Sequence, residues 1–156
     1  MPDETDLDRF VEAQRDTFDS ARAEIAAGRK QTHWMWFIYP QLRGLGQSQR
    51  AWFYGIANLE EAARYLDHPI LGPRLHEMMA LLLPHRDRSA KELFGAVDAQ
   101  KLCSSVTLFR AVPGADPIFD NVLSAFCAGP CTQTEARILG FCPSGTGSLP
   151  APWRPA

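Results

Sequence analysis

A short stretch of this sequence concentrates side chains of the kinds that bind small molecules. Residues 30–41 read Lys-Gln-Thr-His-Trp-Met-Trp-Phe-Ile-Tyr-Pro-Gln. Aromatic rings beside polar groups are typical of ligand pockets, because the rings stack on a flat ligand and the polar groups orient it. A small anionic, nucleotide-like ligand suits this mixture, since basic side chains pair with phosphate. The expected ligand-binding residues are Lys30, His33, Trp34, Trp36, Gln41 and Thr107.

If the site is enzymatic, two side chains are its candidate catalytic residues. His33 is the acid/base candidate, because an imidazole can gain or lose a proton near neutral pH. Lys101 is the candidate for stabilising negative charge that develops during a reaction. No second ligand occurs at metal-binding spacing from His33, and no nucleophile motif accompanies it. The sequence therefore predicts no metal and no cofactor, and it does not identify a reaction.

Two other interpretations of the same segment stay open. The aromatic residues also fit a protein-interaction module, in which exposed Trp and Tyr side chains anchor a partner. Alternatively, the segment has a purely structural role, with the tryptophans packed in the core and each indole N–H bonded to a carbonyl. The nearby Gly44-Leu-Gly46 run lacks the Lys-Thr ending of a phosphate loop, so we interpret it as a turn that leads to a helix cap at Ser48.

The composition argues against several classes of protein. The chain has 156 residues, a net charge of -2 from 16 basic and 18 acidic side chains, and 46% hydrophobic residues. It contains no basic block, so we expect no nucleic-acid partner. No apolar run approaches the roughly 20 residues that span a bilayer, and the polar start at residues 1–6 does not resemble a signal peptide. We therefore expect no membrane association and a cytoplasmic location; the oligomeric state does not follow from the sequence.

The cysteines form no metal-binding or disulfide motif. They are Cys103, Cys127, Cys131 and Cys142, and no two of them make a Cys-x-x-Cys pair. The spacing of Cys127 and Cys131 fits one helical turn, but a structural zinc site needs a second pair of this kind. Because no export signal is present, we expect small buried thiols.

Hydrophobic spacing and capping residues predict a helical chain. Apolar residues recur at intervals of three and four, and capping boxes begin at Asn58, Ser89 and Thr132. Residues 34–39 fit a short strand, a helix or an extended piece. The expected helices cover about residues 7–27, 58–66, 70–83, 89–95, 97–111, 116–126 and 132–139.

These elements predict an all-α protein, a compact single-domain bundle of about six to eight short and medium helices. No stretch alternates apolar and polar residues between hairpin turns, so no sheet of any size is expected. The helical domain is expected over residues 7–140. A polar extension at residues 1–6 precedes it, and a flexible tail rich in Pro and Gly at residues 141–156 follows it.

Several short motifs occur together along this chain and indicate a family. They are His33-Trp-Met-Trp36, Pro40-Gln41, Gly44-Leu-Gly46, His68-Pro69, Lys101-Leu102 and Ser104-Ser105. Over about residues 7–140 this combination resembles the family called domain of unknown function 1810. The resemblance implies a mainly helical single domain and no established activity. Some members carry the label calpastatin, but nothing in this sequence resembles an inhibitor repeat.

Overall fold

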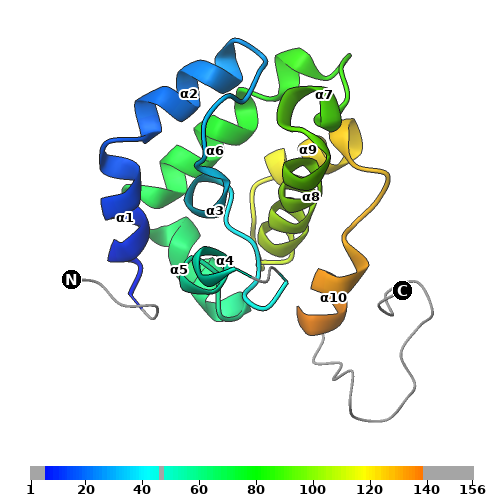
Figure 1. Ribbon diagram of the computed structural model, residues 1–156. Helices are drawn as coiled ribbons and strands as arrows, with labels where there is room; N and C mark the ends of the chain where they lie inside the picture. The colour runs from blue at the N-terminus through cyan, green and yellow to red at the C-terminus, as the bar shows by residue number, and fades with distance from the viewer. Residues whose placement is uncertain (1–5, 46–47, 139–156) are drawn as a thin grey trace.

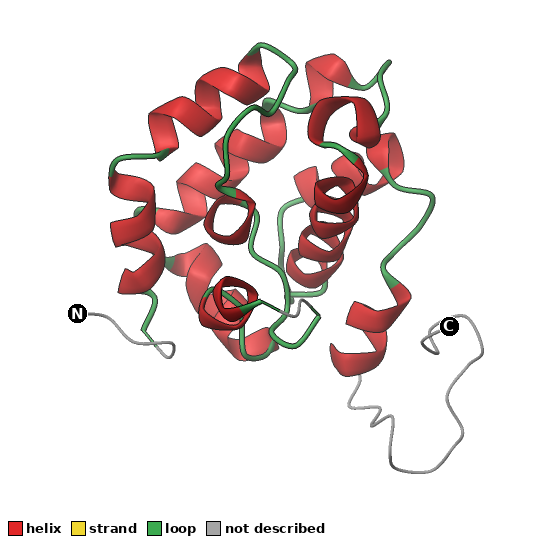
Figure 2. Cartoon of the chain, in the orientation of Figure 1, coloured by secondary structure: helices red, strands yellow, loops and turns green. Residues whose placement is uncertain are grey.

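The computed structural model describes residues 6–45 and 48–138, which form a helical fold (Figure 1, Figure 2). Its helices are α1 (Asp8–Arg15), α2 (Phe18–Ala26), α3 (Met35–Ile38), α4 (Gln49–Phe53), α5 (Leu59–Asp67), α6 (Leu71–Ala80), η1 (Leu83–His85), α7 (Ala90–Phe94), α8 (Ala96–Arg110), α9 (Ile118–Phe126) and α10 (Thr132–Ile138). The described residues form no strand, only an isolated bridge between Leu42 and Ile56. The all-α prediction is confirmed. The predicted extension and tail lie outside the described residues, apart from Asp6.

The helices are more numerous than the sequence predicts, with ten α-helices and one 3-10 helix in the described ranges. The single helix predicted over residues 7–27 is wrong, because the chain breaks at Asp16 and Thr17 into α1 and α2. Asp and Thr are weak helix formers, since their short side chains compete for backbone hydrogen bonds. After the break, Phe18 of α2 joins Phe10 of α1 in the core. No helix in the described part of the chain has the length and apolar character to cross a bilayer.

Helix α8 is the central element of the fold. It packs against α5, α7, α9 and α10, and Figure 1 shows these helices around it. Leu102, Val106 and Phe109 are fully buried, as their spacing predicts. Ser105 and Thr107 are buried as well, because neighbouring helices cover more than one side of α8. Several residues of this helix line the candidate site.

Local capping residues define several helix starts. The side chains of Asn58 and Ser89 each accept a hydrogen bond from the backbone N–H three residues later, at 2.8 and 3.1 Å. Ser48 caps α4 in the same way, at 3.0 Å. The third predicted box is wrong by one residue, because Thr132 is already the first residue of α10. There the carbonyl of Cys131 accepts the first backbone hydrogen bond of the helix.

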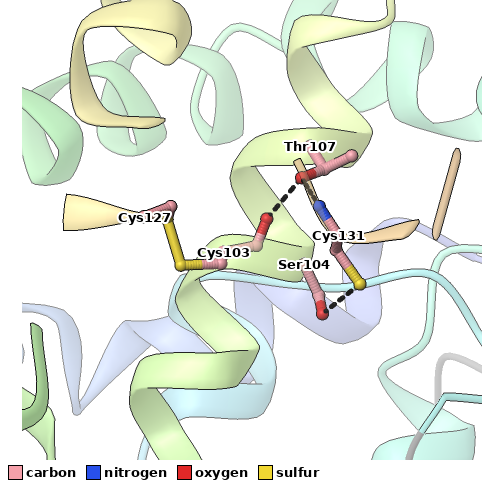
Figure 3. The surroundings of a disulfide bond; sticks show 5 residues. All are labelled: Cys103, Ser104, Thr107, Cys127 and Cys131. Carbon is pink, nitrogen blue, oxygen red and sulfur yellow. Dashed lines mark hydrogen bonds between the residues drawn. A yellow bond between two sulfur atoms is a disulfide. The ribbon is translucent and has the colours of Figure 1, made fainter. Parts of the chain in front are cut away.

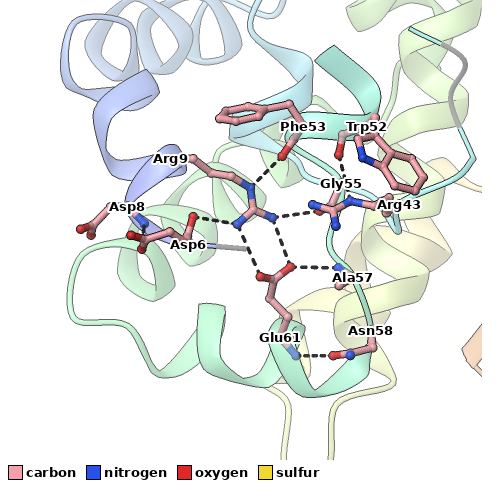
Figure 4. Close-up of polar contacts among 10 residues, drawn as sticks. All are labelled: Asp6, Asp8, Arg9, Arg43, Trp52, Phe53, Gly55, Ala57, Asn58 and Glu61. Atoms are coloured by element: carbon pink, nitrogen blue, oxygen red, sulfur yellow. Dashed lines mark hydrogen bonds and ion pairs between the residues drawn. The ribbon is translucent and has the colours of Figure 1, made fainter. Parts of the chain in front are cut away.

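A buried ion pair fixes α4 and the chain after it to α1 and α5 (Figure 4). Arg9 donates to the carbonyls of Phe53 and Gly55 at 2.8 and 2.9 Å, and its guanidinium lies 3.2 Å from the Glu61 carboxylate. Both charged side chains are almost completely buried. A buried ion pair is tolerated when additional hydrogen bonds satisfy its polar atoms, as these carbonyls do. The pair thereby holds α4 in position beside the candidate site.

Candidate functional site

A groove of about 1020 Å³ runs beside α8. Its walls come from α8, from the start of α7, from the segment 126–133 that leads into α10, and from α4 with the loop before it. In Figure 1 the segment 126–133 and α10 lie to one side of α8, and α4 lies to the other. This volume is at the upper end of what small-molecule sites occupy.

The described lining of the groove carries positive charge and no negative charge. Its charged side chains are Lys91 and Lys101, and uncharged polar groups come from residues such as Gln41, Gln100 and Ser48. The whole sequence contains only three lysines, so two of the three line this groove. A concave surface with charge of one sign attracts ligands of the opposite sign. The groove is therefore suited to an anion.

Two cationic side chains lie over the partly buried ring of Trp36. The Lys101 Nζ atom is 5.0 Å from the ring centroid, and the guanidinium carbon of Arg50 is 5.3 Å from it. A small cavity of about 10 Å³ adjoins Trp36, and both Gln41 and Lys101 line this cavity as well as the groove. A cation–π contact holds a cation in place without neutralising it. Three of the predicted site residues, Trp36, Gln41 and Lys101, are therefore neighbours where the cavity meets the groove.

Lys30 is linked to Lys101 through the carboxylate of Asp98. Its ammonium group lies 2.9 Å from one oxygen of Asp98, and the other oxygen lies 3.7 Å from the Lys101 ammonium. Lys30 also donates to the carbonyl of Thr32 at 2.6 Å, and its side chain is 7% exposed. Lys30 is therefore held by Asp98 and by the Thr32 carbonyl, and it is not among the described residues that line the groove. Asp98 joins two predicted site residues, and the sequence interpretation did not include it in the site.

Trp34 has a structural position. Its side chain is fully buried, and the indole N–H donates to a Glu24 oxygen at 3.0 Å. The same carboxylate accepts hydrogen bonds from the Gln31 N–H and from the N–H and hydroxyl of Thr32, at 2.6, 2.9 and 2.6 Å. Partial burial alone would raise the pKa of Glu24, but these hydrogen bonds together lower it to about 2. Trp34 and Glu24 thus anchor the segment 30–41 to α2.

The other two ring-bearing residues of the His-Trp-Met-Trp motif, His33 and Trp36, are both at least partly exposed, unlike Trp34. The stretch 34–39, for which the sequence left three conformations open, forms the one-turn helix α3. The first tryptophan of the motif precedes this helix and enters the core, whereas Trp36 lies within it and is partly exposed. His33 is exposed on the surface, and its side chain makes no hydrogen bond or ion pair with any residue in the described ranges. It does not belong to the described lining of the groove, so its catalytic role remains a prediction.

Thr107 is buried in α8, and its hydroxyl holds the segment 126–133, one wall of the groove, in position. Its hydroxyl donates to the carbonyl of Cys103 at 2.7 Å and accepts from the backbone N–H of Cys131 at 2.8 Å. These two bonds use the hydroxyl to hold the start of α10 against α8. The structure therefore gives Thr107 a positioning contact, and direct ligand binding by its side chain remains a prediction.

The expectation of buried thiols is wrong for the three cysteines in the described residues, because two of them form a disulfide and the third, Cys131, is partly exposed. Cys103 in α8 and Cys127, just after α9, form a disulfide (Figure 3). Both residues are partly exposed and line the groove. The pairing depends on the packing of α9 against α8, which brings together cysteines 24 positions apart. Cys131 is a free thiol whose sulfur lies 3.4 Å from the hydroxyl of Ser104. The segment 126–133 is thus tied to α8 at two places.

The described residues of the groove supply groups that can bind a ligand. Among the described residues, no group of three or more His, Cys, Asp or Glu side chains is placed to hold a metal ion. The described lining of the groove contains lysine, amide, hydroxyl and sulfur groups, without a histidine or carboxylate to act as a general base. What it offers a ligand is positive charge and hydrogen bonds.

Comparison with known proteins gives a family and a fold. The profile of the family described as "Protein of unknown function (DUF1810)" matches residues 4–139. Among solved structures, the crystal structure of the conserved hypothetical protein Rv1873 from Mycobacterium tuberculosis is similar to this chain. The two are 51% identical over 78% of this chain and 86% of that chain, with a TM-score of 0.76. None of the curated proteins matches this chain.

Proposed function

We propose that this chain, which belongs to the DUF1810 family of proteins of unknown function, binds a small anionic, nucleotide-like ligand in the groove beside α8. The observation that carries the proposal is the charge of the groove, whose described lining holds two lysines and no carboxylate. Its volume of about 1020 Å³ accommodates a molecule the size of a nucleotide. Polar groups beside the lysines allow such a ligand to be oriented as well as attracted.

Lys101 is the proposed main contact of the ligand's phosphate. Asp98 is its only carboxylate partner among the described residues, at 3.7 Å, and the same carboxylate lies closer to Lys30, at 2.9 Å. The attraction between Lys101 and Asp98 is therefore incomplete, because the interaction energy of two charges falls with distance. A phosphate is a stronger partner for an ammonium group than a neutral indole is. In the bound state Lys101 would leave the ring of Trp36 and contact the phosphate.

The uncharged part of the ligand would meet the polar lining of the groove. Gln41 and Gln100 each carry a carbonyl acceptor and an NH₂ donor, which suit the edge of a heterocyclic base. Lys91 on α7 supplies the second positive charge. Trp34 and Thr107 would support the site from the core without touching the ligand. The proposal is one of binding, and it does not use His33, which is not among the described residues that line the groove.

Isothermal titration calorimetry with ADP-ribose and with ATP tests the proposal. Lys101→Gln should weaken binding at least about tenfold, since a hydrogen bond to a charged group contributes about 1.5 kcal/mol or more. Arg64→Gln is the matched control, because it removes one exposed positive charge on α5 that does not line the groove. Absence of binding heat with both compounds would count against the proposal. Equal weakening in the two variants would show a general effect of net charge instead.

One exposed aromatic side chain supports a second candidate function, that of a protein-interaction module. Trp52 in α4 is 53% exposed, and the guanidinium carbon of Arg43 lies 5.1 Å from its ring centroid. Trp and Arg are the residue types that most often anchor protein interfaces. Binding to a cellular protein that is lost with Trp52→Ala and kept with Lys101→Gln would favour this function over ligand binding.

A further inference from the structure

We propose that the Cys103–Cys127 disulfide is a thiol–disulfide exchange site for a small anionic thiol that enters the groove. Both cysteines line the groove and both are partly exposed, so a molecule in the groove has access to the disulfide. Exposed disulfides are the ones that exchange readily, whereas structural disulfides are usually protected from attack. The chemistry uses the same groove as the proposed function but needs no bound nucleotide.

The charge of the groove selects the kind of thiol. Lys91 and Lys101 are the charged side chains of its described lining, and no carboxylate accompanies them there. A cleft with charge of one sign raises the local concentration of an oppositely charged reactant. Positive charge also favours exchange itself, because both the attacking and the departing sulfur are thiolate anions. A small thiol that carries a carboxylate or sulfonate is therefore the expected reactant.

The exchange step conserves atoms and electrons. The incoming thiol gives up its proton, and its thiolate attacks the sulfur of Cys103 or Cys127. The bond between the two protein sulfurs breaks as the bond to the incoming sulfur forms, so one cysteine becomes a mixed disulfide. The other cysteine leaves as a thiolate and takes up a proton. No further oxidant or reductant is needed, because one disulfide replaces another.

The segment 126–133, which forms one wall of the groove, should stay in place when the disulfide opens. Besides the disulfide, the segment 126–133 is held to α8 by the hydrogen bond between the Thr107 hydroxyl and the backbone N–H of Cys131. Figure 3 shows this bond beside the disulfide, with the contact between Ser104 and the Cys131 sulfur next to it. Opening the disulfide removes one tie and leaves the other. Exchange should therefore take place in the folded protein.

The test compares thiols that differ in charge. The full chain is prepared with Cys131→Ser and Cys142→Ser, so that Cys103 and Cys127 are the remaining cysteines. Anionic mercaptoethanesulfonate, neutral 2-mercaptoethanol and cationic cysteamine are added under native conditions at low salt. Mass spectrometry after acid quenching measures the rate of mixed-disulfide formation. Each rate per thiolate is divided by the rate of the same thiol with neutral bis(2-hydroxyethyl) disulfide, which corrects for intrinsic reactivity.

On this scale the anionic thiol should react roughly tenfold faster than the cationic thiol, in line with electrostatic attraction into a charged cleft. The ratio should fall to near one with Lys91→Gln plus Lys101→Gln, and also at high salt, which screens charges. Equal rates for the three thiols, or reaction only after unfolding, would overturn the proposal.

The chain without substitutions provides the second measurement, in case the serine variants fold poorly. There the adduct should map to Cys103 or Cys127, and an adduct confined to Cys131 or Cys142 would also overturn the proposal. The two proposals fail separately. Calorimetry with nucleotides does not depend on the exchange reaction, and the order of exchange rates does not depend on nucleotide binding.

Discussion

Replacing Glu24 with glutamine should lower the free energy of unfolding at neutral pH by about 1–2 kcal/mol. The carboxylate accepts four hydrogen bonds, from the N–H groups of Gln31 and Thr32, from the Thr32 hydroxyl and from the Trp34 indole. Together they lower its pKa from 4.5 to about 2, and one pKa unit corresponds to about 1.4 kcal/mol. The expected loss is smaller than that full difference, because Glu24 is partly exposed and solvent screens its interactions.

The pH dependence of this loss is the stricter test. Since the pKa of Glu24 is lower in the folded than in the unfolded chain, its stabilisation is present above about pH 4.5 and disappears as the pH falls toward 2. Urea unfolding of the unsubstituted chain and of Glu24→Gln should therefore show a gap between their free energies of unfolding. This gap should shrink to less than half of its size between about pH 7 and pH 3. The exposed control Glu12→Gln should show no such gap. A gap of constant size over this range would refute the assignment.

Urea unfolding also tests three other contacts. Arg9→Met leaves the buried carboxylate partner without its counter-charge and should cost about 3–5 kcal/mol; a loss below about 1 kcal/mol would contradict the buried pair. Trp34→Ala should cost about 3–5 kcal/mol because the indole is fully buried, whereas Trp36→Ala should cost less, and equal losses would contradict their different positions. Reducing Cys103–Cys127 frees a loop of 24 residues and should cost about 3 kcal/mol; unchanged stability would argue against the disulfide.

Helix starts could be predicted from the sequence because a cap is a local pattern. The side chains of Asn58 and Ser89 reach backbone groups only three residues away, so the neighbouring sequence determines the geometry. The break at Asp16 and Thr17 could not be predicted in this way. Apolar spacing continues through both α1 and α2, and the position of Phe18 in the core depends on the helices it packs against.

The candidate site could be predicted only in part, because some of its residues are close in the sequence and others are brought together by helix packing. Trp36 and Gln41 are close in sequence, and the short helix α3 and the chain after it keep them together beside Lys101. His33 belongs to the same motif but is exposed, because it lies in the bend before α3 and outside the helix that carries Trp36. Lys91 and the segment 126–133 reach the groove through the packing of α7 and α9 on α8. Contacts of this long-range kind leave no spacing signal in the sequence.

A nitrogen-15 NMR titration with ADP-ribose tests the proposed ligand site most directly. The indole N–H groups give separate signals, so the experiment follows Trp34, Trp36 and Trp52 individually. If the phosphate draws Lys101 away from its ring, Trp36 should show the largest indole shift, together with the side-chain amide of Gln41. The Trp34 signal should stay nearly fixed, because Glu24 holds that indole in the core. Binding that moves Trp52 and leaves Trp36 unchanged, or no shift at all, would contradict a ligand site in this groove.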